Sequence, residues 1–356
     1  MKSKLLILIA AFLVSIIPLS GQTSSVPRDK FTLLTIPYNK RPLTLYKGQF
    51  QANAGYKFAI RSRSYDKDGN LIVLKDVGTA SVYHYYFLEM KYGVTNFLEL
   101  SAQTNYMKRG VRSVTESYYA SASDAILVNT VTETKGFGDI LILASLRLPI
   151  TYKWFDVSIS GGTFIPSAKY QPAEPTHKVS NITAASAFTV DYHFNNKNGY
   201  GIPVWQVSGA SKFTVSKFSL EADFTYRKPF KEGQNIRWDQ ELTAAKTFTY
   251  SNNNYKYLLN SSYDVNASLH FQATGWLNVE LNSWYFYSGG GWTEYWGDKY
   301  KNRKENLFTL EPALEIQISP AIKIYEVASF PLSGKNIDAP FSLFMTLSYN
   351  LFPFLK

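Results

Sequence analysis

The chain contains no cysteine among its 356 residues. This absence excludes disulfides, a thiol nucleophile, a cysteine-based zinc site and the lipid anchor of a lipoprotein. It also suits a protein exported to an oxidising compartment. Histidine is scarce, and its four positions match neither HExxH nor the i, i+4 pair of a helical zinc site: His84, His177, His193 and His270. We therefore expect no metal, no cofactor and no catalytic residues.

Long apolar runs are missing too. The longest covers residues 5–19, which is shorter than the roughly 20 residues that a spanning helix needs. Lys2 and Lys4 precede this run and the small residues Ser20 and Gly21 follow it, which is the order of a secretory signal peptide. We predict a signal peptide over residues 1–21 and no transmembrane helix in the rest of the chain.

What the sequence does contain is alternation of apolar and polar residues from about residue 49 onward. In the last block the polar residues Ser342, Thr346, Ser348 and Asn350 face away from the apolar set Phe341, Leu343, Met345, Leu347, Tyr349 and Leu351. A period of two places successive side chains on opposite faces of a strand. The mean hydropathy of −0.17 fits strands that are apolar on one face only.

This alternation predicts an all-β fold, a transmembrane antiparallel up-and-down β-barrel over residues 49–356. Twelve strands are expected, near residues 49–60, 80–91, 97–107, 136–148, 154–165, 202–212, 217–227, 258–271, 276–287, 305–318, 321–329 and 340–352. Short connections then fall on one side and long ones on the other, as in bacterial barrels. Two further stretches, 184–194 and 237–249, leave fourteen strands as the alternative. Pro312 predicts a bulge within its strand.

Residues 22–48 show no clear strand pattern. They hold three prolines and five basic residues: Pro27, Arg28, Lys30, Pro37, Lys40, Arg41, Pro42 and Lys47. Two interpretations stay open, a disordered periplasmic tail and a plug that enters the barrel.

The strand faces opposite the apolar ones are polar and mostly acidic. The candidates that we expect to line the lumen are Glu99, Asp139, Arg147, Asp156, Glu221, Asp223, Arg227, Glu280, Glu311 and Glu315. Such acids would favour cations in a wet pore, or they would pair with bases in a closed interior. Because twelve strands enclose a modest lumen, we favour the closed interior and expect no free diffusion of large solutes.

The net charge of +10 comes from basic residues in tails and expected loops. We therefore expect contact with outer-membrane lipid and lipopolysaccharide, and no nucleic-acid partner. The 16% of aromatic residues predicts girdles at the two membrane interfaces.

Three short segments resemble a known family. They are the turn and strand Tyr92-Gly-Val-Thr-Asn-Phe-Leu-Glu-Leu100, the step Gly136-Phe-Gly-Asp139 and the strand end Gly162-Thr-Phe-Ile-Pro166. Together they resemble the outer-membrane barrels labelled "putative MetA pathway of phenol degradation", which are distantly similar to hydrophobic-compound channels. Asn96 stands where the family has Asp, and Ser167-Ala168 replaces a Thr-Gly step. The resemblance implies passive uptake of small, hydrophobic or aromatic molecules.

The sequence thus predicts an outer-membrane channel or transporter of a Gram-negative bacterium, exported through the periplasm, inserted by the barrel-assembly machinery and not an enzyme. The main alternative is a structural or interaction barrel, such as an adhesion or secretion-system subunit. A barrel lipase is the remote alternative, with His270 as the base.

Overall fold

A computed structural model describes residues 43–74, 81–121, 124–149, 154–167, 171–172, 188–195, 200–242, 248–295, 298–319 and 321–351. The predicted signal peptide 1–21 and residues 22–42 of the tail or plug lie outside these ranges. Within the described ranges every regular element is a strand, and no helix there is long and apolar enough to cross a membrane.

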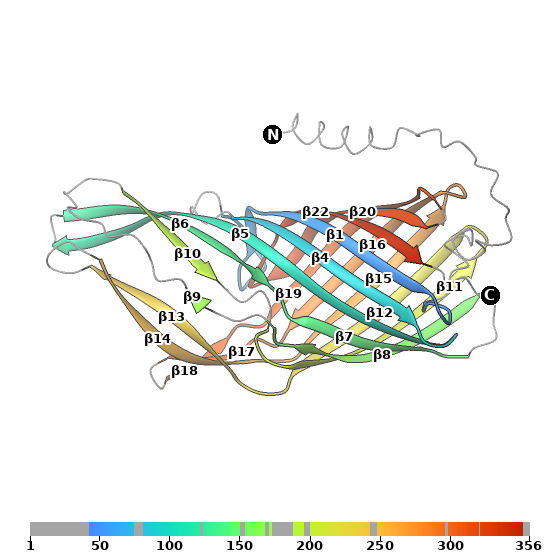
Figure 1. Ribbon diagram of the computed structural model, residues 1–356. Helices are drawn as coiled ribbons and strands as arrows, with labels where there is room; N and C mark the ends of the chain where they lie inside the picture. Colours follow the sequence, from blue (N-terminus) through green and yellow to red (C-terminus); the bar gives the residue numbers. More distant parts are fainter. Residues whose placement is uncertain are drawn as a thin grey trace, which may run out of the picture. The chain divides into compact units, whose positions relative to one another are not determined.

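Twelve antiparallel strands form a closed ring (Figure 1). In ring order they are β4 (Ser81–Gly93), β1 (Phe50–Arg61), β22 (Phe341–Leu351), β20 (Ile322–Lys335), β19 (Glu305–Gln317), β16 (Leu277–Ser288), β15 (Ser262–Gln272), β12 (Phe218–Pro229), β11 (Val204–Val215), β8 (Phe155–Ile165), β7 (Ile140–Arg147) and β5 (Leu98–Ser121). Pairing of β5 with β4 closes the ring, with a register that runs from Ser81↔Val111 to Gly93↔Glu99. The predicted barrel of twelve strands is confirmed.

The described residues of the two stretches behind the fourteen-strand alternative are not part of the ring. Stretch 184–194 overlaps β10 (Phe188–Asn195), which is parallel to its partner β6 (Asp124–Phe137). Its other partner, the short β9 (Gln171–Pro172), runs antiparallel to it. Stretch 237–249 overlaps β13 (Gly233–Leu242) and β14 (Phe248–Leu259), which form a separate sheet with β17 (Gly291–Tyr295) and β18 (Asp298–Asn302). A third small sheet holds β2 (Arg63–Tyr65), β3 (Leu71–Val73) and β21 (Ile337–Asp338).

The two ends of the barrel differ in their connections. At one end, which we call the turn end, short connections join β4 to β5, β7 to β8, β11 to β12, β15 to β16 and β19 to β20. In three of them a hydroxyl accepts the backbone N–H three residues later, at the start of the next strand: Thr95 from Leu98, Thr274 from Leu277 and Ser319 from Ile322. These side-chain turns end one strand and start the next. In the described ranges, the additional strands all belong to connections at the other end, the loop end.

The barrel is polar inside and apolar outside. On β12, Phe218 and Leu220 are both 51% exposed, whereas Ser219 between them is 1% exposed. The same reversal holds around the ring, where buried residues are mostly polar and the exposed strand faces carry Leu, Ile, Val and Phe. Exposed apolar faces of this extent are unfavourable in water and are stable in contact with lipid hydrocarbon.

Aromatic rings mark both borders of the apolar surface. At the turn end Trp154 packs on Phe213 with ring centroids 5.2 Å apart, and Phe218 packs on Phe271 at 4.9 Å. At the loop end, Trp205 meets Tyr226 at 5.6 Å. Phe218 and Tyr226 lie eight residues apart on β12, which is about 26 Å along a strand at about 3.3 Å per residue. With a strand tilt of about 40°, this span corresponds to a height of about 20 Å along the barrel axis, which lies within an apolar band of roughly 25 Å.

The prediction of a bulge at Pro312 is wrong. Pro312 lies opposite Leu281 in an unbroken register between β16 and β19. The register of β19 with β20 shifts between Phe308 and Thr309, where Thr309 lies opposite Pro331. Because proline has no N–H to donate, the irregularity falls beside Pro331 instead.

The lipid contact of the outer surface can be tested at Ala222. This exposed residue lies midway along β12 between the two aromatic borders, so Ala222→Arg would place a charge near the centre of the bilayer. We expect the free energy of unfolding from lipid vesicles to fall by about 2–4 kcal/mol. Ala222→Leu is the control and should leave it unchanged within error; equal stability of the two variants would contradict the lipid contact.

Candidate functional site in the barrel lumen

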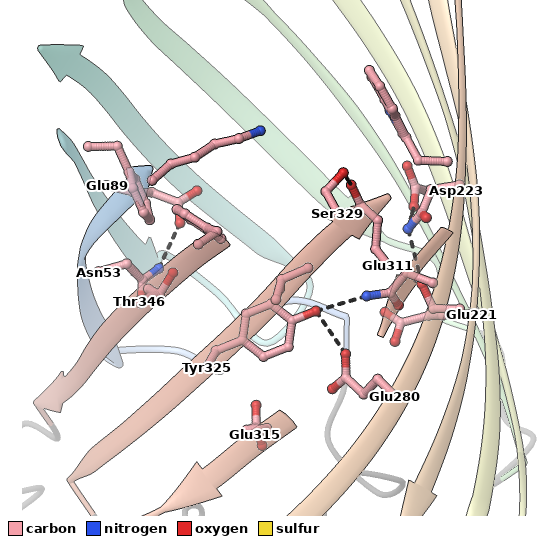
Figure 2. Close-up of a pocket in the computed structure, with 18 of the residues that line it drawn as sticks. Asn53, Glu89, Glu221, Asp223, Glu280, Glu311, Glu315, Tyr325, Ser329 and Thr346 are labelled. Carbon is pink, nitrogen blue, oxygen red and sulfur yellow. Dashed lines mark hydrogen bonds between the residues drawn. The ribbon is translucent and has the colours of Figure 1, made fainter. Parts of the chain in front are cut away.

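The described residues line two adjoining cavities in the barrel interior. The larger, of about 750 Å³, is lined by β1, β4, β12, β15, β16, β19, β20 and β22, and Figure 2 shows part of its wall. The smaller measures about 510 Å³ and is lined by β1, β4, β5, β16, β19, β20 and β22, together with residues from the connection before β22. The two share seven lining residues: Lys57, Phe87, Trp284, Glu311, Ser329, Ser342 and Phe344.

The wall of the larger cavity is acidic on balance. Seven carboxylates line it (Glu89, Glu221, Asp223, Asp264, Glu280, Glu311 and Glu315) against four lysine and arginine side chains (Lys57, Lys91, Arg227 and Lys323). The excess is three negative charges, with His270 left out of the count. Its field therefore attracts cations and repels anions.

Several of these charges are paired along the wall. Lys323 Nζ lies 3.0 Å from Glu315 Oε2, and Lys91 Nζ lies 3.4 Å from Glu89 Oε1. Arg227 forms a salt bridge with Asp264 through Nη1. Removing a charge from bulk water costs free energy, and an isolated charge on a half-buried wall has no partner to offset this cost. The salt bridges offset it.

A hydrogen-bonded network crosses β12, β15, β16 and β20. His270 has both ring nitrogens 3.2 Å from a carboxylate, with Nε2 facing Glu221 and Nδ1 facing Glu280. Tyr325 donates its hydroxyl to Glu280 at 2.9 Å and accepts from the Asn282 amide at 3.0 Å, as drawn in Figure 2. The two hydrogen bonds of Tyr325 fix its side chain on the wall between Glu280 and Asn282.

The smaller cavity is aromatic. Tyr83, Tyr85, Phe87, Trp284 and Phe344 line it. The rings of Tyr83 and Tyr85 stack with centroids 5.9 Å apart and an interplanar angle of 7°, and Phe87 meets Phe344 at 5.2 Å. Its charges balance, with Lys57 and Arg61 against Glu311 and Asp338.

A missing side chain makes room for one of these rings. A Cβ added to Gly55 on β1 would lie 1.8 Å from Cε1 of Phe87 on the neighbouring β4. The two residues are direct cross-strand partners in the ladder. The Phe87 ring therefore lies over Gly55 at the junction of the cavities, where any larger residue at position 55 would displace it.

The ten residues predicted to line the lumen divide into three groups. Six lie on the wall of the larger cavity: Glu221, Asp223, Arg227, Glu280, Glu311 and Glu315. Glu99, Arg147 and Asp156 lie at the turn end, where Arg147 Nε is 2.7 Å from Asp156 Oδ1.

Asp139 lines neither cavity. Its carboxylate follows the end of β6 and accepts the backbone N–H of Tyr200 at 2.6 Å and of Gly201 at 3.2 Å. Asp139 thus holds the segment that leads into β11.

The sequence reasoning missed Lys91, Lys323 and the inward aromatic residues. Lys91 lies two residues after the inward Glu89, and Phe344 lies two residues after the inward Ser342. The period of two, carried to the ends of each strand and applied to aromatic residues, would have found them. The predicted girdles place aromatic rings on the lipid face, whereas these rings lie on the inward face.

The prediction of a closed, salt-bridged interior agrees with the structure in its salt bridges and differs from it in the space that remains. The salt bridges exist, yet two cavities remain between them, together large enough for a small solute. Among the described residues, no group of three or more His, Asp or Glu side chains is placed to hold a metal ion.

Comparison with known proteins gives likenesses of fold. No family model and no curated protein matches the chain. A crystal structure of the COG4313 outer membrane channel from Pseudomonas putida F1 is similar with a TM-score of 0.60 and 12% identity, over 86% of this chain and 97% of that one. The P. putida toluene transporter TodX is less similar, with a TM-score of 0.48 and 10% identity, over 91% of this chain and 93% of that one. The likeness to the COG4313 structure shows that the chain shares the fold of that outer-membrane channel.

The pairing of Arg227 can be tested by Arg227→Met, which keeps much of the side-chain volume. The variant would leave Asp264 without this salt bridge and Gln206 Oε1 without the 2.9 Å hydrogen bond from Arg227 Nε. We expect the free energy of unfolding to fall by about 1–3 kcal/mol. Arg227→Lys, which keeps the charge, should recover part of the loss; no loss in Arg227→Met would show that the pair contributes nothing to stability.

Proposed function

We propose that the protein is an outer-membrane channel for passive uptake of small solutes, with no chemical step. The observation that supports this most directly is the combination of an apolar outer face with a polar lumen that holds two adjoining cavities. An interior built only for stability would be filled by side chains. The shared fold with an outer-membrane channel agrees with this function.

The two cavities favour different parts of a solute. The stacked tyrosines, Phe87, Phe344 and Trp284 of the smaller cavity offer faces on which a planar or apolar group can stack. The excess of carboxylates in the larger cavity favours a positive charge or hydrogen-bond donors. Small aromatic or amphipathic molecules that carry a polar group fit this arrangement better than purely apolar ones.

The membrane contacts follow from the charge of the loop end. On β18, Lys299, Tyr300 and Lys301 are exposed, and Lys299 lies over the ring of Trp292 at 4.3 Å. Basic and aromatic side chains at this end suit the phosphates and sugars of lipopolysaccharide. We place the protein in the outer membrane of a Gram-negative cell, reached by export and inserted by the barrel-assembly machinery.

Ion selectivity in planar bilayers tests the channel. Under a KCl gradient the protein should pass current with a reversal potential displaced toward that of potassium, because the larger cavity carries excess negative charge. Asp223 and Glu311 accept hydrogen bonds from the neutral groups of Asn266 and Ser329. The double variant Asp223→Asn, Glu311→Gln removes their charge and should therefore shift the reversal potential toward zero.

Lys57→Met provides the opposite change, since Lys57 lines both cavities. Its loss should increase selectivity for potassium. Absence of current from the wild type and all variants would overturn the channel and favour a structural barrel. If the reversal potential is the same in the wild type, the double variant and Lys57→Met, ions pass by a path other than the two cavities.

A further inference from the structure

Residues 43–48, directly before β1, lie against the inside of the barrel at the turn end. Their backbone donors are held one after another: Leu43 N–H donates to Asp156 Oδ2 at 2.9 Å, Leu45 N–H to Glu99 Oε2 at 2.8 Å and Lys47 N–H to Asn96 Oδ1 at 3.3 Å. Gly48 N–H donates to the carbonyl of Gly93 at 2.7 Å. Thr44 is only 3% exposed. We call these residues the strap.

The strap is on the lumen side of the strands that it crosses. Its two carboxylate acceptors belong to the inward faces of β5 and β8, since the flanking Leu100 points outward and Glu99 is 6% exposed. From β1 the ring passes through β4, β5 and β7 before it reaches β8. The strap therefore spans four of the twelve steps around the mouth, one third of the ring.

A glycine marks its path. A Cβ added to Gly93 would lie 1.9 Å from the carbonyl oxygen of Tyr46, so only glycine lets the strap pass this close to the end of β4. The segment Tyr92–Leu100 thus supplies the Gly93 carbonyl, the Asn96 amide and the Glu99 carboxylate to the strap. The channel function gives no role to the segment Tyr92–Leu100, whereas contact with the strap gives a role to Gly93, Asn96 and Glu99.

We propose that the strap is a built-in closure of the turn-end mouth, latched by the carboxylates of Glu99 and Asp156. When latched it narrows the exit from the larger cavity; when released it leaves the mouth open toward the periplasm, which the short turns of bacterial barrels face. Hydrogen bonds to a carboxylate are among the stronger ones in proteins. Water replaces the strap N–H groups as donors to these carboxylates after release, so opening is reversible. The closure rests on the proposed channel function, but the latch itself does not.

The cysteine-free chain allows a direct test of the latch. Thr44→Cys introduces the only thiol, at a buried position of the strap. In detergent-solubilised full-length protein this thiol should react slowly with a polar maleimide. Adding Glu99→Ala and Asp156→Ala should raise the reaction rate at least tenfold, because each lost hydrogen bond to a charged group is worth about a factor of ten in the latching equilibrium.

Gly93→Val tests the same latch without a change of charge. Its side chain would collide with the Tyr46 carbonyl, so it should also expose the thiol at position 44. Gly209→Val on β11 is the matched control, because a Cβ there meets nothing within 4 Å, and it should leave the thiol protected. A folded barrel in every variant is checked by its heat-modifiable migration on gels.

The same variants without the thiol then report on closure in planar bilayers. Single-channel conductance should rise in both the Glu99→Ala, Asp156→Ala variant and Gly93→Val, and not in Gly209→Val. An exposed thiol with unchanged conductance would overturn the closure, because the strap would then leave the path unobstructed. A thiol that stays protected in both release variants would overturn the latch. Silence of all variants, with the thiol exposed, would instead overturn the channel on which the closure rests.

Discussion

Closure of the backbone ladder is the constraint on which the rest of the structure depends. In hydrocarbon no water satisfies an unpaired N–H or C=O group, so a sheet can cross a bilayer only if its first and last strands pair. Here β1 pairs with β22 on one side and with β4 on the other, and β4 in turn pairs with β5, which completes the ring. Once the ring is closed, every strand has one face toward lipid and one toward the lumen, and the alternation of the sequence follows.

The closed ring turns charged side chains toward a half-buried lumen, where they pair with one another. The inward faces carry many charges, and charges on a half-buried wall need partners. Arg227 with Asp264, Lys323 with Glu315 and the carboxylates around His270 meet that need without filling the lumen. Most of the interior is therefore held by pairs along the wall, which leaves space between opposite walls for a solute.

Much of the fold could be predicted from the sequence, and less of the site. The block from Phe341 to Leu351 shows its two faces directly, and the ring confirms the count of strands. The sequence did not predict which face aromatic residues occupy, because an aromatic ring can lie on the lipid face or on the lumen face of a strand. Phe344 and Trp284 look like membrane aromatics, but their phase on the strand turns them inward. Pro312 looked like a break, yet the irregularity lies across the ladder near Pro331.

The sequence by itself determined the fold class, an antiparallel β-barrel. The alternation of apolar and polar residues with a period of two is local, so it can be read one strand at a time. The sequence also determined which residues share a face. Only the tertiary structure decided which inward residues meet, since Glu99 and Asp156 lie 57 residues apart and on strands that are not neighbours. Both reach the strap because ring closure and stagger bring their strand ends to the same mouth. That juxtaposition depends on the registers of the four pairings that lead from β1 through β4, β5 and β7 to β8, which no single segment of the chain encodes.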